Sequence, residues 1–191
     1  ITARPITLTA SSATKVYGEV DPSLAVTVTS GSLASVAVTD TLASVTGTLS
    51  RSAGEDVGNY NILLGSGSKA ANYTITFNSA NAAMGITARP IYISADSSQT
   101  KIYGNADPSL TYSVQAKATG SGLLGTDSVT VTGSVSRAAG ENVGSYAIGQ
   151  NTVAASGTKA SNYSISYTGA NFAITARPIT LTASSATKVY G

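Results

Sequence analysis

An internal repeat constrains the fold of this chain more than any other feature of its sequence. The segment Ile1-Thr-Ala-Arg-Pro-Ile6 returns at residues 86–91 and again at residues 174–179, at spacings of 85 and 88 residues. Residues 174–191 copy residues 1–18 without a change. Self-similarity at a long fixed period indicates structural units arranged in tandem. We therefore expect two complete repeats and the opening of a third, within an internal segment of a longer protein.

Further sequence blocks keep step with this opening and recur in the same order. They predict four segments: residues 1–4 as the end of a preceding strand, residues 5–89 and 90–177 as the two repeats, and residues 178–191 as the start of a third. The recurring residues that we interpret as a structural motif are Lys15, Tyr17, Gly18, Asp21, Pro22, Tyr60 and Tyr73, with Lys101, Tyr103, Gly104, Asp107, Pro108, Tyr146 and Tyr163 in the second repeat.

The local patterns favour β structure. β-Branched and aromatic residues alternate with polar ones over residues 6–10, 25–29, 60–62, 73–77 and 172–176, which is typical of half-buried strands. Glycine and proline turns separate these runs, and the only candidates for a helical turn lie near residues 33–36 and 122–125. The sequence thus predicts a mainly β fold with two elongated tandem domains, sandwich-like or β-grasp-like, each with at most one short helix. These domains would be joined end to end and followed by the first strand of a third repeat.

The junctions between repeats carry the dipeptides Arg89-Pro90 and Arg177-Pro178. Before the second junction the apolar residues have even numbers, as at Ile174, and after it they have odd numbers, as at Ile179. A shift by one residue moves side chains to the opposite face of a strand, and proline removes one ladder donor. We therefore expect one extended ribbon that exchanges its buried face between domains and links them semi-rigidly.

Composition excludes several classes of function. The chain has no Cys, His or Trp, a net charge of +2, and only 10% charged residues. Thiolate or imidazole chemistry is therefore absent, and no positive cluster is present that would bind nucleic acid. No apolar run approaches the ~18 residues of a membrane span. We predict no catalytic, cofactor-binding or metal site, and a segment that is monomeric.

Two motifs suggest chemistry but lack its context. Residues 12–15, 98–101 and 185–188 match Ser-x-x-Lys, yet the partner motifs of penicillin-recognising enzymes are missing, so a strand end with a solvated Lys is the better interpretation. Residues 120–125 spell Gly-x-Gly-x-x-Gly without the surrounding βαβ unit that dinucleotide binding requires, and we expect a flexible loop there.

The acidic residues leave two further alternatives open. Calcium would need six to eight oxygen ligands, for which the candidates are Asp21, Glu55, Asp56, Asp107 and Glu141. We favour instead a turn in which Asp21, like Asp107, caps its own backbone. An internal amide bond would need a Lys, an Asn and an acid buried together, for example Lys15, Asn72 and Glu55.

Two groups of tyrosines differ in how they recur. The six Tyr of the structural motif are the expected core anchors, because they recur at fixed positions within alternating strands. Tyr92 and Tyr112 have no Tyr counterpart in the first repeat. They are therefore the better candidates for a surface that contacts a ligand.

The ordered blocks resemble the MBG repeat (YGX type) of large secreted bacterial adhesins. The residues that carry the resemblance are Ile-Thr-Ala-Arg-Pro-Ile at 1–6, Lys-Val-Tyr-Gly at 15–18, Asp-Pro-Ser-Leu at 21–24, Ala-Gly-Glu-Asp-Val-Gly-Asn-Tyr at 53–60 and Asn-Tyr-Thr-Ile-Thr-Phe at 72–77. The resemblance implies a β module without catalytic residues, secreted or displayed on the bacterial surface, that forms a stalk for a distal adhesive region. Its partners would be neighbouring repeats of the same chain. The alternative is a weak multivalent module that binds glycan, host matrix or another copy.

Overall fold

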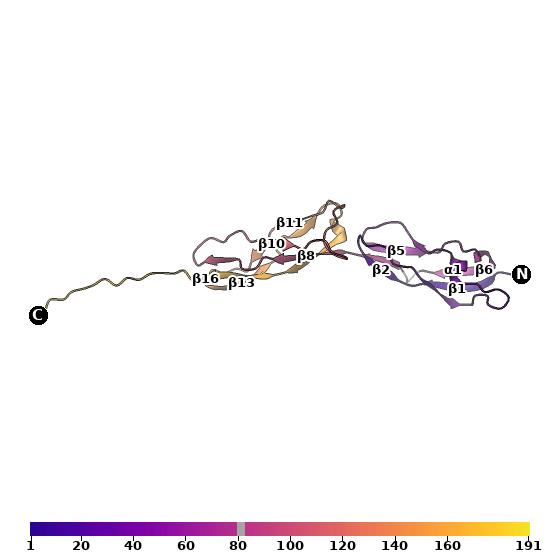
Figure 1. The fold of residues 1–191 in the computed structure, drawn as a ribbon, viewed down its shortest axis with the longest axis horizontal. Helices are drawn as coiled ribbons and strands as arrows, with labels where there is room; N and C mark the ends of the chain where they lie inside the picture. Colours follow the sequence, from indigo (N-terminus) through magenta and orange to yellow (C-terminus); the bar gives the residue numbers. More distant parts are fainter. Residues whose placement is uncertain (80–82) are drawn as a thin grey trace. The chain divides into compact units, whose positions relative to one another are not determined.

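The computed structural model describes residues 1–79 and 83–191, and strands dominate it (Figure 1). In the first repeat the elements are β1 (Arg4–Ala10), β2 (Ala13–Val16), β3 (Val26–Ser30), α1 (Leu42–Thr46), β4 (Ser50–Arg51), β5 (Gly58–Leu63), the 3-10 turn η1 (Ala70–Asn72), β6 (Tyr73–Asn78) and β7 (Ala83–Thr87). In the second they are β8 (Arg89–Ala95), β9 (Thr100–Ile102), β10 (Tyr112–Val114), β11 (Thr130–Thr132), β12 (Ser136–Arg137), β13 (Gly144–Gly149), β14 (Ala154–Ser156), η2 (Ala160–Asn162), β15 (Tyr163–Thr168) and β16 (Ala170–Thr175).

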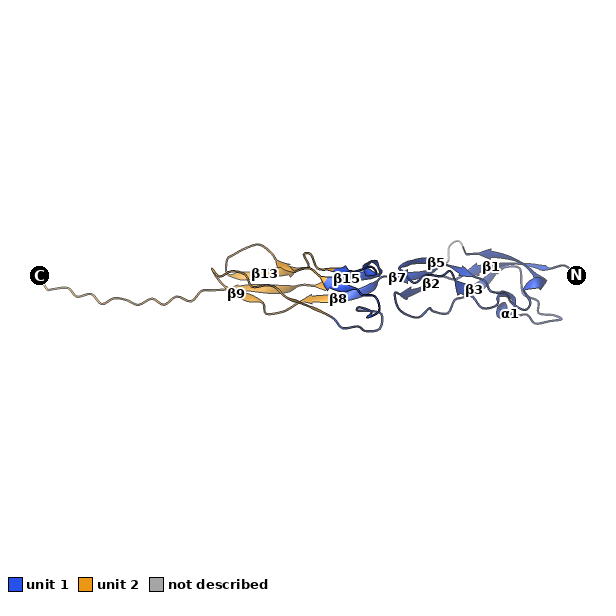
Figure 2. Ribbon diagram, turned by 90° about the horizontal axis from the view of Figure 1, so that it is seen from above, with its two compact units in different colours: residues 1–92, 115–131, 155–166 blue, residues 93–114, 132–154, 167–191 orange. Residues whose placement is uncertain are grey.

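The chain divides into two compact units (Figure 2). Unit 1 comprises residues 1–92, 115–131 and 155–166, and unit 2 comprises residues 93–114, 132–154 and 167–191. Unit 1 therefore holds the whole described first repeat together with three segments of the second. The repeat boundaries at residues 89 and 177 stay a prediction.

Unit 1 contains two sheets of the first repeat, ordered β3-β1-β6 and β2-β7-β5-β4. β1 runs parallel to β6 and antiparallel to β3, and β7 runs parallel to β2 and antiparallel to β5. Buried Ala10 and Val26 of the first sheet share a core cluster with Ile62 and Met84 of the second. The two sheets therefore pack on each other, as the sandwich-like alternative predicts.

α1, the one α-helix among the described residues, begins where its sequence supplies a cap. Thr41 accepts a hydrogen bond from the backbone N–H of Ser44, whose side chain accepts one from the backbone N–H of Thr41, so the two form a capping box. Val45 of α1 is fully buried against β1 and β6. The expected helical turn near residues 33–36 is wrong in position, because those residues form no helix and α1 lies at Leu42–Thr46.

The second repeat reproduces the strand order of the first. Its sheets are ordered β10-β8-β15 and β12-β13-β16-β9, matching β3-β1-β6 and β4-β5-β7-β2. The segment equivalent to α1 is instead strand β11, which pairs with β14. β14 lies in the stretch where the second repeat is four residues longer, so the insertion supplies a strand partner. The predicted mainly β fold with two tandem domains is confirmed.

The first junction has the predicted change of buried face. β7 ends at Thr87 and β8 begins at Arg89, so only Ala88 separates them. Met84 and Ile86 are buried before the junction, and Arg89 and Ile91 are buried after it. The buried positions therefore change from even to odd numbers between Ile86 and Arg89, directly before Pro90.

Residues 176–191 form no strand and are exposed, although residues 4–16, which they largely copy, form β1 and β2. In the first repeat these strands pair with β3, β6 and β7. The 191 residues hold no third copy of those partners. Without them the apolar side chains of Ile179 and Leu181 have nothing to pack against.

Candidate functional site

Each repeat contains a cluster of two cations and two carboxylates. In the first, the Lys15 ammonium at the centre of β2 lies 2.6 Å from an oxygen of Asp21 and 2.6 Å from one of Glu55. Arg51 of β4 donates to both oxygens of Asp21, through Nε at 2.7 Å and a terminal nitrogen at 3.2 Å, and also pairs with Glu55. We call these four residues the ion-pair cluster.

The cations of this cluster are buried and its acids are exposed. The side chains of Lys15 and Arg51 are 5% and 8% exposed, against 41% for Asp21 and 63% for Glu55. The Arg51 guanidinium also lies 4.9 Å from the ring centroid of Tyr60, a cation–π distance. The expected solvated Lys is therefore wrong, because Lys15 faces two carboxylates.

The cluster fixes the charge state of its members. Hydrogen bonds from Arg51 and then Lys15 lower the pKa of Asp21 to about 2. A hydrogen bond from Lys15 lowers the pKa of Glu55. Burial opposes the charged form of Lys15, but its bonds to the two acids outweigh this and raise its pKa. All four groups are ionised at neutral pH.

The contacts of the cluster bear on two of the alternatives raised by the sequence. Both oxygens of Asp21 bind cations, so the expectation that this side chain caps its own backbone is wrong. An internal amide bond needs a Lys and an Asn buried together, whereas Lys15 is buried against Asp21 and Glu55, and Asn72 is exposed in η1. The cluster therefore opposes the cross-link.

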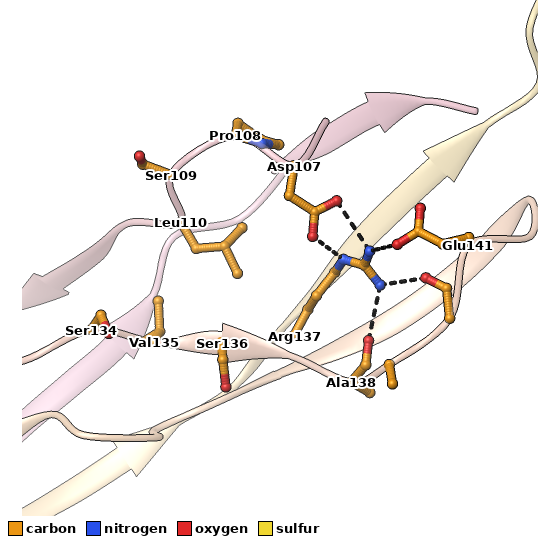
Figure 3. A pocket seen from close by; sticks show the side chains of 12 residues that line it. Asp107, Pro108, Ser109, Leu110, Ser134, Val135, Ser136, Arg137, Ala138 and Glu141 are labelled. Atoms are coloured by element: carbon orange, nitrogen blue, oxygen red, sulfur yellow. Dashed lines mark hydrogen bonds and ion pairs between the residues drawn. The ribbon is translucent and has the colours of Figure 1, made fainter. Parts of the chain in front are cut away.

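The second repeat has the same cluster, formed by Lys101, Asp107, Arg137 and Glu141. Figure 3 shows the Arg137 guanidinium between the Asp107 and Glu141 carboxylates, at one end of a groove of about 560 Å³ lined by residues 107–110 and 134–141. The first repeat has an equivalent groove of about 560 Å³. Hydrogen bonds from Arg137 and then Lys101 lower the pKa of Asp107 to about 2.

The grooves offer little chemistry to a ligand. Their charged groups already neutralise one another, and in residues 1–79 and 83–191 no group of three or more Asp and Glu side chains could hold a metal ion. The acids proposed as calcium ligands instead face Lys or Arg: Asp21, Glu55, Asp56, Asp107 and Glu141. The arrangement is typical of a structural ion-pair network.

A second polar cluster lies within unit 1 and joins residues of both sequence repeats. At its centre is Arg89, which is 1% exposed. Its guanidinium donates to the backbone oxygens of Tyr17 (3.1 Å), Ala118 (2.7 Å), Ser121 (2.9 Å) and Gly122 (2.8 Å), and to Glu19 Oε1 (2.7 Å). A guanidinium has five N–H donors, so these five bonds satisfy it completely.

Neighbouring contacts extend this arrangement. Glu19 Oε1 also accepts from the backbone N–H of Gly120 at 2.9 Å, and the bond from Arg89, followed by that from Gly120, lowers the pKa of Glu19. The rings of Tyr17 and Tyr163 meet edge to face at 5.6 Å. Tyr163 donates to Asp127 at 2.6 Å, and burial followed by this bond raises the pKa of Tyr163 to about 12.

The first repeat supplies a further acid to this cluster. Asp56 Oδ1 lies 2.6 Å from the Lys159 ammonium and accepts from Asn162 Nδ2 at 2.8 Å. The side-chain oxygen of Asn162 in turn accepts from the backbone N–H of Val57 at 2.8 Å. We call the whole set the junction cluster: Tyr17, Glu19, Asp56, Val57, Arg89, residues 118–122, Asp127, Lys159, Asn162 and Tyr163.

The tyrosines proposed as core anchors differ in exposure. Tyr17, Tyr73 and Tyr163 are 6–8% exposed, and Tyr60 and Tyr146 are partly buried and donate to backbone oxygens. Tyr103 is 47% exposed, so its assignment to the core is wrong. The surface candidate Tyr92 is 43% exposed, and Tyr112 is partly buried and bonds to the backbone oxygen of Gly133.

Sequence reasoning missed most of the junction cluster. Arg89 was expected only to change the buried face, and residues 120–125 were expected to form a flexible loop. Instead this loop presents its carbonyl oxygens to Arg89, and its Gly122 N–H donates to the backbone oxygen of Pro90. No side-chain motif signals such a site, because most of its acceptors are backbone oxygens.

Comparison with family models identifies both repeats. A model described as MBG domain (YGX type) matches residues 6–83 and residues 91–173. No curated protein and no solved structure matches the chain significantly. No helix in the described part of the chain is long and apolar enough to cross a membrane. The family resemblance drawn from the sequence motifs is confirmed.

Proposed function

The chain belongs to the MBG domain (YGX type) family, and from this membership we propose that it is a spacer segment in the stalk of a secreted or surface-displayed bacterial adhesin. In this role each repeat adds length between the cell and a distal adhesive region. MBG domains are structural β repeats that occur in tandem and are typical of extracellular bacterial proteins. The recurring residues of the structural motif would then serve the fold rather than a reaction.

The observation that carries this proposal is the bonding of Arg89. A fully buried guanidinium with all five donors used ties the Tyr17–Glu19 turn of the first repeat to the 118–122 loop of the second, within unit 1. Charge-assisted hydrogen bonds are stronger and more directional than neutral ones. A spacer needs such a joint, since a flexible connection would shorten its reach.

One observation favours the alternative, a weak multivalent binding module. Both repeats have a groove of about 560 Å³ in the same place, so a ligand that fits one would fit both, and avidity would add the contacts. The internal ion pairs argue against a strong ligand, because a binding group would have to displace them.

Small-angle X-ray scattering on the 191-residue chain tests the spacer role. A single compact domain of 191 residues would have a radius of gyration of about 16–17 Å, and we expect a clearly larger value with an elongated distance distribution. A value near that of one globule would refute the spacer. Glycan-array binding by the same chain at millimolar or tighter affinity would favour the alternative.

A further inference from the structure

Three residues that are buried in the junction cluster have counterparts at equivalent repeat positions, and these counterparts are exposed. Tyr17 is 6% exposed, whereas its counterpart Tyr103 is 47% exposed. Arg89 is 1% exposed, whereas its counterpart Arg177 is exposed. Asn162 is 1% exposed, whereas Asn72, at the same motif position of the first repeat, is exposed. Burial of these residues therefore accompanies the contact between two repeats and not the repeat fold itself.

The bonds of Arg177 reproduce two of the five bonds of Arg89. Within unit 2, Arg177 Nε donates to the backbone oxygen of Tyr103 at 3.0 Å, and a terminal nitrogen donates to Asn105 Oδ1 at 2.7 Å. These acceptors correspond to the backbone oxygen of Tyr17 and the carboxylate of Glu19. In unit 1 the other three bonds of Arg89 go to the 118–122 loop of the repeat that directly follows Arg89.

Arg177 is likewise followed directly by the opening of a further repeat. Residues 174–191 are identical to residues 1–18, so the repeat that begins there is of the first-repeat type. Its Asn-Tyr motif would meet Tyr103 in the way that Tyr163 of the second repeat meets Tyr17.

We propose that Tyr103, Asn105 and Arg177 form a docking surface for a third repeat of the first-repeat type, whose Asn-Tyr motif covers Tyr103 as Tyr163 covers Tyr17. This inference deepens the proposed spacer role by naming the partner at the second junction.

The second junction differs in charge from the first. Asn105 stands at the position of Glu19, and Asn142 at that of Asp56. Both acids that face Arg89 and Lys159 in the junction cluster are thus replaced by neutral amides. The first junction is therefore ionic, whereas the second depends on neutral acceptors and tyrosine packing. Only the first contains ion pairs that added salt would screen.

Protection of Tyr103 tests the docking surface. The 191-residue chain is compared with an extended chain, in which a copy of residues 19–89 follows Gly191 and completes the third repeat. Both are nitrated with tetranitromethane, and each Tyr is followed by peptide mass spectrometry. Tyr103 should react readily in the shorter chain and several-fold more slowly in the extended one, as its exposure falls from 47% towards the 6% of Tyr17. Tyr17 should stay protected in both.

Two variants of the extended chain make the test specific. Arg177→Ala should restore the reactivity of Tyr103, whereas Arg4→Ala, at the matching position of the first repeat, should leave it protected. Equal reactivity of Tyr103 in the two parent chains would overturn the proposal, and so would an unfolded third repeat by circular dichroism, since a docked repeat must be folded. Scattering from a compact particle would refute the spacer role alone and leave Tyr103 protection as a separate result.

Discussion

Replacing Arg89 by Ala should destabilise unit 1 strongly, because the substitution removes five hydrogen bonds from a site that is 1% exposed. Charge-assisted bonds contribute about 1.5–3 kcal/mol each when measured singly, but their sum overstates the effect, since burial of the guanidinium has its own desolvation cost. Removing one partner of a buried ionic network costs about 3–5 kcal/mol. We expect a loss in this range, because four backbone oxygens and the Glu19 carboxylate lose their donor.

Arg177→Ala is the matched control. Arg177 has the same place in its junction motif, yet it is exposed and makes two of the five bonds. Exposed interactions of this kind contribute about 0–1 kcal/mol. Arg89→Lys provides an intermediate case, because an ammonium has three donors instead of five and must leave at least two acceptors without a partner.

The assay is urea unfolding, followed by circular dichroism and by tyrosine fluorescence, with hydrogen exchange at the Gly120 and Gly122 amides as a local measure. Arg89→Ala should shift the unfolding midpoint of unit 1 to lower urea and speed exchange at both glycines. If Arg89→Ala and Arg177→Ala cost the same free energy, or if exchange at these amides is unchanged, the assignment of Arg89 as the centre of the junction cluster is refuted.

Three further predictions follow from the same contacts. The pKa of Asp21 and of Asp107 is about 2 in the folded chain and near 4 when unfolded. Both carboxylates therefore stabilise the fold above about pH 4 and lose this effect as the pH falls towards 2. The free energy of unfolding in urea should be lower at pH 2 than at pH 5, and equal values would contradict this. The pKa of Tyr163 is raised to about 12, so its bond to Asp127 stabilises below about pH 10 and is lost towards pH 12. An ultraviolet titration should show a tyrosine that ionises near pH 12, and this signal should be missing in Tyr163→Phe. Gly122→Ala should lower the thermal unfolding midpoint far more than Gly120→Ala. Both glycines have positive φ, but only at Gly122 would the new Cβ meet backbone, 2.6 Å from the Cα of Lys117. Equal decreases in the midpoint would contradict this.

The strands were predictable from the sequence where local pattern decides the structure. The alternation over residues 6–10 and 73–77 corresponds to β1 and β6, and the change of buried face at Arg89 followed from the parity of the apolar positions. The local pattern does not predict the helix at residues 42–46. The equivalent segment of the second repeat is a strand, because an inserted stretch supplies β14 as its partner.

The ion-pair cluster was only partly within reach of sequence reasoning. Lys15, Asp21, Arg51 and Glu55 all recur in the second repeat, so their joint recurrence was visible, and their charges balance. Lys15 and Glu55 are 40 residues apart, and their contact depends on the sheet order β2-β7-β5-β4. That order depends on long-range pairing, which alternation alone does not specify.

The two polar clusters have different roles in a tandem chain, as a comparison of their residues between the repeats indicates. The ion-pair cluster keeps the same four residue types in both repeats and lies within a single repeat each time. It therefore stabilises the domain regardless of its neighbours. The junction cluster keeps its Arg and Tyr but exchanges Glu19 for Asn105 and Asp56 for Asn142. Substitutions at Lys15 and Lys101 should consequently destabilise their domains alike, whereas substitutions at Glu19 and Asn105 should affect two joints of different chemistry.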